Sequence, residues 1–235
     1  MHRESTSIDQ HLKTPRAAGI AGIAFCILFV IAHLLIRSAL PPYGQGSAIE
    51  FAKHSETISR SLNLVPFAGI AFLWFIAVLR DRLGASEDRF FATVVLGSGL
   101  LYIAMFFASA ALAGGLLAVL SSGTENVVHS GTYAVSRAEI NHLLNVYGIK
   151  MAGVFMISFS TISLRTRIIR RWLVFLGWAL ALLLLLSIGT IAWAPLVFPL
   201  WVLLISIHVL IEKFHSPLRA DQNSALSAEK SNRAA

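Results

Sequence analysis

The sequence has little charge: Asp, Glu, Lys and Arg make up 13% of its 235 residues, about half the share of roughly 25% that is usual in soluble domains. So few charges cannot cover a globule of this size with a hydrated surface. The hydrophobic share of 56% and the mean hydropathy of +0.72 agree. This composition argues against a soluble enzyme, a disordered chain and a nucleic-acid-binding domain.

Cysteine and catalytic motifs are also scarce. Cys26 is the only cysteine, so an intramolecular disulfide, a CxxC redox pair and a cysteine-rich metal site are excluded. The sequence contains no HExxH, GxSxG or P-loop motif and no histidine set with metal-ligand spacing. We therefore predict no catalytic residue, no metal and no cofactor, and we expect Cys26 to be a buried apolar thiol.

Long apolar runs dominate what is present. A helix needs about 20 mostly apolar residues to cross a hydrocarbon core about 30 Å thick, and a helix closes its own backbone hydrogen bonds in lipid. We predict an all-α, polytopic transmembrane bundle of six helices. The spans are 17–40, 62–79, 90–120, 143–164, 172–193 and 195–211.

The ends of these spans allow two further predictions. The first apolar run is longer than that of a cleaved signal peptide, so we expect a retained anchor. Trp193, Ala194 and Pro195 form a tight connection between the last two spans. Pro195 suits the first turn of a new helix because it has no amide hydrogen to lose.

The basic residues predict the orientation. With both termini cytoplasmic, 14 Lys and Arg residues fall on the inner side and 4 on the outer side, as the positive-inside rule expects. The four on the outer side are Arg37, Lys53, Arg60 and Arg137. The decisive inner loop carries Arg165, Arg167, Arg170 and Arg171 and no acid, and we predict that these arginines meet anionic lipid headgroups.

The segments outside the spans differ in character. Residues 1–16 and 213–235 are polar, and we predict that they are mobile cytoplasmic tails, leaving 17–212 as the membrane domain. Within the outer loop 41–61, apolar residues recur at helical spacing, and Glu56–Arg60 is a favourable charge pair. This pattern favours a short helix in the outer interface over a solvated loop. Ser136-Arg137-Ala138-Glu139 fits a capping box, so we expect the fourth helix to begin outside the bilayer.

Ionisable residues inside spans are the default functional candidates because each is costly there. Lys150 lies about 10 Å below the outer end of the fourth span, at the depth of His33 in the first. We predict a cationic pocket in the outer half for an anionic or lone-pair-bearing ligand, formed by His33, Arg37, Tyr147 and Lys150. In the alternative, Arg37 and Lys150 only extend to the headgroups and His33 bonds to a neighbouring helix.

Four segments carry a resemblance to a known family. They are Glu87-Asp88-Arg89-Phe90-Phe91-Ala92-Thr93, Met151-Ala152-Gly153-Val154-Phe155-Met156-Ile157-Ser158, and Leu164-Arg165-Thr166 with Arg171-Trp172-Leu173. Together they resemble a family of uncharacterised bacterial multi-helix membrane proteins. The resemblance implies a bacterial inner-membrane location and brings no activity or site residues.

Three classes of function stay open. The first is a non-enzymatic membrane protein that binds a lipid or small ligand or assists a membrane complex, as a homo-oligomer or with a membrane-protein partner. The second is a facilitated transporter or channel subunit; the absence of acids from the spans argues against cation coupling. The third is a membrane-embedded enzyme acting on a lipid or quinone. The sequence favours the first class.

Overall fold

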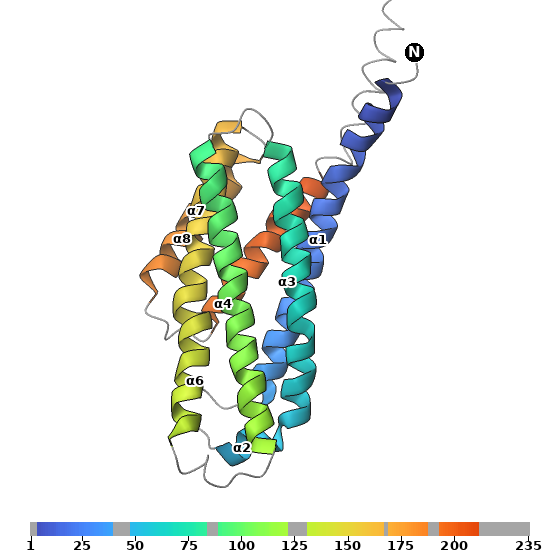
Figure 1. The fold of residues 1–235 in the computed structure, drawn as a ribbon. Helices are drawn as coiled ribbons and strands as arrows, with labels where there is room; N and C mark the ends of the chain where they lie inside the picture. Colours follow the sequence, from blue (N-terminus) through green and yellow to red (C-terminus); the bar gives the residue numbers. More distant parts are fainter. Residues whose placement is uncertain are drawn as a thin grey trace, which may run out of the picture.

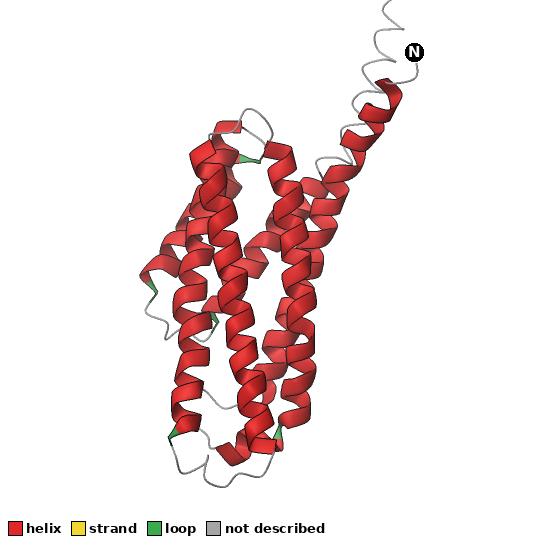
Figure 2. Cartoon of the chain, viewed as in Figure 1, coloured by secondary structure: helices red, strands yellow, loops and turns green. Residues whose placement is uncertain are grey.

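The computed structural model describes residues 4–39, 48–83, 89–121, 131–166, 169–187 and 193–211. Every regular element in these ranges is a helix (Figure 2). The elements are α1 (Glu4–Ala39), α2 (Ala48–Lys53), α3 (Ser55–Leu83), α4 (Arg89–Ser121), α6 (Thr132–His142), the π-helix η2 (Leu143–Gly148), α7 (Ile149–Thr166), α8 (Arg171–Leu186) and Ala194–Ile211, called the terminal helix below. The all-α fold is confirmed.

The helices form one elongated bundle (Figure 1). α1 packs along α3, α4 packs against both α3 and α7, and α8 packs against α7. The terminal helix returns to α1, where Phe198 lies 6.1 Å from Phe25 between ring centroids. α6, η2 and α7 follow one another without a break and form a single helical segment of 35 residues.

Five of these helical segments are long and apolar enough to cross a membrane, and so the chain is a multi-pass membrane protein. The exception is α8, which has 16 residues and is about 24 Å long at 1.5 Å per residue. That is shorter than a hydrocarbon core of about 30 Å. The predicted count of six spans is therefore approximate.

The predicted boundaries are accurate where an apolar run is sharply bounded. α4 and the terminal helix each agree with the predicted spans within one residue at each end, and Pro195 lies in the first turn as expected. α3 begins at Ser55, ahead of the predicted 62. α1 begins at Glu4, because extending an existing helix costs far less than starting one. Most of the predicted tail 1–16 is thus helical, whereas 213–235 lies outside the described residues.

The predicted end of the fifth span at 193 is wrong. α8 ends at Leu186, and Ser187 already has extended backbone angles, φ −61° and ψ 132°. The connection to the terminal helix therefore runs from Ser187 to Trp193 and is not the tight turn expected at Trp193-Ala194-Pro195.

The predicted helix in the loop 41–61 is confirmed as helical structure, interrupted at His54. The two parts are α2 and the first turns of α3. Phe51 and Ile58 are each 1% exposed and pack with Leu116 in a small second core. The Glu56–Arg60 pair is present at 2.5 Å.

The predicted capping box is wrong. α6 begins at Thr132, and its N-cap is Gly131, which has a φ of 70° and makes no side-chain cap. That left-handed conformation is open to glycine at little cost. Ser136 and Glu139 therefore lie inside a helix that starts earlier. The expectation that this helix begins well before Leu143 is confirmed.

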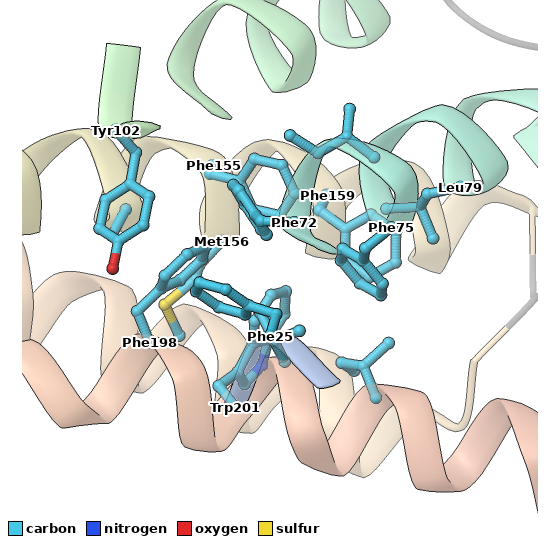
Figure 3. Packing of buried hydrophobic residues seen from close by; sticks show 14 of the residues in the cluster. Phe25, Phe72, Phe75, Leu79, Tyr102, Phe155, Met156, Phe159, Phe198 and Trp201 are labelled. Carbon is cyan, nitrogen blue, oxygen red and sulfur yellow. The ribbon is translucent and has the colours of Figure 1, made fainter. Parts of the chain in front are cut away.

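Aromatic rings hold the centre of the bundle together (Figure 3). Five helices each contribute at least one buried ring, among them Phe25, Phe72, Tyr102, Phe155 and Phe198. Phe72 lies 4.7 Å from Phe25, 5.7 Å from Tyr102, 5.6 Å from Phe155 and 5.3 Å from Phe198 between ring centroids. Because lipid tails are as apolar as the core, such packing contacts are what bring membrane helices together.

We expect Phe72→Ala to lower the thermal stability of the detergent-purified protein strongly, since it removes the ring that contacts four other helices. Phe to Ala changes in packed cores cost about 3–5 kcal/mol. Phe67→Ala is the matched control, on the same helix and with a side chain that is 62% exposed. Intrinsic fluorescence measures the melting temperatures. Equal values for the two variants would contradict the central role of Phe72.

The segments that carry most of the charged residues lie at the two ends of the bundle. The start of α1 and the turn between α7 and α8 lie at one end, and α2 and α6 lie at the other (Figure 1). At the first end Arg165, Arg170 and Arg171 are exposed. This arrangement is the one that the predicted orientation requires.

Cysteine labelling in cells tests which end faces outward. In a Cys26→Ala background, we expect Glu139→Cys in α6 to react with a membrane-impermeant maleimide. Arg170→Cys should react only after the membrane is opened. Both positions are exposed, so accessibility within the protein is matched. Labelling of Arg170→Cys in intact cells would reverse the orientation.

Candidate functional site

Lys150 lies near the start of α7 and reaches the end of α8. Its Nζ donates hydrogen bonds to the backbone oxygens of Leu185, at 2.7 Å, and Ser187, at 3.2 Å. The last carbonyls of a helix have no partner within that helix. A cation there also interacts favourably with the negative end of the helix dipole. Lys150 therefore caps α8. These contacts are not the ones expected if Lys150 only extended to the lipid headgroups.

The π-helix η2 immediately precedes this lysine. A turn with i→i+5 hydrogen bonds holds one more residue than an α-helical turn, so the side chains beyond it are rotated about the axis. π-helical turns occur frequently at functional sites. Gly148, in the last position of η2, is buried, and a Cβ built there would lie 3.1 Å from the backbone oxygen of Leu143. Glycine suits this tight turn.

Arg37 lies at the other end of the same connection. Its guanidinium carbon is 4.6 Å from the ring centroid of Trp193, the residue just before the terminal helix. A cation over an indole face is an attractive arrangement. Lys150 and Arg37 thus contact the first and last residues of the Ser187–Trp193 connection, of which 188–192 lie outside the described part.

His33 is half-buried one turn before Arg37 on α1. Its ring stacks on Phe29, with centroids 6.1 Å apart and planes at 10°. Its Nε2 is buried and has no hydrogen-bond partner among the described residues. Tyr147 in η2 is 58% exposed. The structure thus shows partners for Lys150 and Arg37. The pocket formed by all four predicted residues stays a prediction.

Sequence reasoning missed the other half of this site. Leu185 and Ser187 were not singled out, although Ser187 interrupts an otherwise apolar run. That serine was the available signal that a helix ends there. Trp193 was assigned to the connection, but its contact with Arg37 was not predicted.

The predicted arginine cluster lies at the opposite end of α8. Arg165 stands over Phe91 with 5.2 Å between its guanidinium carbon and the ring centroid. Arg170 is the N-cap of α8 and Arg171 its first residue, and the first turn has no acid. Positive charge is unfavourable at a helix N-terminus, and the predicted contact of these arginines with anionic headgroups stays a prediction. Arg167 lies outside the described residues.

Among the residues that the structure describes, no group of three or more His, Cys, Asp or Glu side chains could hold a metal ion. Comparisons with protein-family models, curated proteins and solved structures find no match to this chain. The resemblance to a bacterial membrane protein family and the inner-membrane location therefore remain predictions. Fold and composition define the class: a multi-pass, all-α membrane protein.

The cap on α8 gives a prediction for Lys150→Met. This variant loses both hydrogen bonds to the α8 carbonyls, and hydrogen bonds to charged groups contribute about 1.5–3 kcal/mol. We expect a lower melting temperature in detergent. Lys53→Met, at an exposed position of α2, should change it little, and Lys150→Arg should retain part of the stability. An unchanged melting temperature for Lys150→Met would contradict the capping role.

Proposed function

We propose that the chain is a non-enzymatic membrane protein that binds an anionic amphiphile beside the Ser187–Trp193 connection. Lys150 and Arg37 are the cationic contacts. One observation carries the proposal: the charge of Lys150 lies in an apolar helix against neutral backbone carbonyls. The sequence contains no Asp or Glu between 140 and 211.

The energetics favour an anion at this position. A lysine at the centre of a span costs about 2.5–3.5 kcal/mol, and a helix C-terminus supplies roughly half a negative charge. A phosphate would supply the rest of the negative charge that is needed to balance the ammonium. The ammonium has three N–H groups, and two are used by Leu185 and Ser187, which leaves one for an acceptor.

The surroundings favour an amphiphile over a soluble anion. Lys150 belongs to a segment apolar enough to lie in the membrane. The exposed ring of Tyr147 and the buried Nε2 of His33 offer further polar contacts at the same predicted site. Tyrosine suits this place because its ring is apolar and its hydroxyl polar.

The proposal includes a second contact with anionic headgroups at the other end of α8. Arg165, Arg170 and Arg171 are exposed there, and the first turn of α8 contains no acidic residue. Basic residues near a membrane surface each contribute roughly 1 kcal/mol of attraction to anionic lipid. The arginine-rich end thus binds lipid by charge density, whereas the Lys150 site depends on defined partners.

Native mass spectrometry of the detergent-purified protein tests the proposal, with phosphatidylglycerol and phosphatidylcholine as probes. We expect preferential retention of phosphatidylglycerol, reduced several-fold by Arg37→Gln, which leaves the α8 cap intact. Lys53→Gln is the charge-matched control at an exposed position. The double variant Arg170→Gln/Arg171→Gln separates the contribution of the arginine-rich end.

Lys150→Gln completes the series, provided that its melting curve shows folded protein. Equal retention of phosphatidylglycerol by the original protein, Arg37→Gln and folded Lys150→Gln would overturn the proposed site. Equal retention of the two lipids by the original protein would overturn the requirement for an anion.

A further inference from the structure

Four hydroxyl groups of α7 fall into two sets. Those of Thr161 and Thr166 bond back to their own helix, at 2.8 Å to the backbone oxygen of Ile157 and 2.9 Å to that of Ile162. This is the usual arrangement of hydroxyls in helices. Ser160 and Ser163 are each 1% exposed, and within the described ranges their Oγ atoms have no hydrogen-bond partner. These two hydroxyls lie buried in the bundle with their hydrogen-bonding capacity unused.

Trp201 of the terminal helix carries a third such group. Its side chain is 1% exposed, and its ring lies 5.6 Å from that of Phe159 between centroids. The indole Nε1 has no hydrogen-bond partner among the described atoms. Figure 3 shows this ring at the aromatic core.

Gly177 of α8 brings two of these groups together. A Cβ built on this glycine would overlap Ser160 Oγ and lie 3.1 Å from Trp201 Nε1. Both polar atoms therefore lie against the same point of α8. Any larger residue would occupy this place, so glycine keeps it open for the polar atoms.

The chemistry of the three groups is complementary to one small molecule. The indole N–H can only donate, whereas each serine hydroxyl can donate or accept. A buried water typically makes about three hydrogen bonds to groups that otherwise lack partners. A water here would accept from Trp201 and bond to Ser160 and Ser163, and none of these groups is charged.

We propose that a water molecule binds between α7, α8 and the terminal helix, where it joins Trp201 Nε1 to the Ser160 and Ser163 hydroxyls beside Gly177. The site is independent of the anion site at Lys150. It explains why Ser160 and Ser163 do not return to their own helix, as Thr161 and Thr166 do.

The direction in which Ser160→Ala changes the melting temperature tests the proposal. Removing a buried hydroxyl that has no partner relieves a desolvation cost, so a dry site predicts that Ser160→Ala raises the melting temperature or leaves it unchanged. A bound water predicts a lower melting temperature, because Ser160→Ala removes one of its partners. Ser109→Ala is the control: Ser109 is also buried, and its hydroxyl bonds to the backbone oxygen of Phe106 at 2.8 Å.

A double-variant cycle tests whether the groups share the water. We expect Ser160→Ala to lower the melting temperature less in a Trp201→Phe background than alone. Equal decreases in both backgrounds would overturn the shared water. An increased or unchanged melting temperature for Ser160→Ala in the original protein would also overturn it.

Magnetic resonance supplies a direct test in the folded protein. In micelles, the indole N–H of Trp201, assigned through Trp201→Phe, should show magnetisation transfer from water that Ser160→Ala weakens. Trp74, whose side chain is 66% exposed on the outside of α3, gives the reference for an indole at the detergent surface. A folded original protein whose Trp201 indole shows no transfer from water would overturn the proposal.

Discussion

The hydrogen bonds from Lys150 to the end of α8 determine where the last two helices meet. α8 is too short to cross a bilayer, so its terminal carbonyls require donors within an apolar environment. Lys150 supplies them at Leu185 and Ser187. Trp193, the residue before the terminal helix, stacks against the guanidinium of Arg37. The starting point of the terminal helix thus depends on a lysine in α7 and an arginine in α1.

The aromatic core depends in turn on that starting point. Phe198 lies one turn into the terminal helix and contacts the rings of Phe25, Tyr102 and Phe155. A shift of the helix by one residue would rotate Phe198 by about 100° at 3.6 residues per turn and remove it from these contacts. Apolar packing holds the bundle together, and the polar contacts around α8 set its register.

The parts of the fold that could be predicted are those that depend on residues close together in the sequence. α4 and the terminal helix follow apolar runs whose ends are marked by charged residues or proline, and Phe51 and Ile58 follow helical spacing. The end of α8, by contrast, depends on a residue far away in the sequence. Its apolar run continues to Trp193, and the residue that caps it lies 35 positions earlier in the sequence. The π-helix and the start of α6 at Gly131 likewise depend on backbone geometry, which composition does not record.

The same distinction applies to the candidate site. Lys150 and Arg37 could be identified from the sequence, because cations in apolar runs are conspicuous. Their partners could not be identified, because these are two backbone carbonyls and a tryptophan of a distant connection. Ser160 belongs to a polar patch that is visible in the sequence, but hydroxyls in a helix usually bond back to their own carbonyls. A hydroxyl such as that of Ser160, or an indole such as that of Trp201, becomes unusual only when the surrounding helices leave it without a partner.

α8 links these observations. Gly177 and Leu185 are eight residues apart on this helix, a rise of about 12 Å. Gly177 lies against the Ser160 hydroxyl, and the backbone oxygen of Leu185 accepts from the ammonium of Lys150. The other membrane helices are long enough to span on apolar length alone. α8 is not, and it pairs its backbone and its glycine with polar groups of α7. A short helix can remain in place in an apolar bundle when a neighbouring helix supplies polar contacts of this kind at its end and along its side.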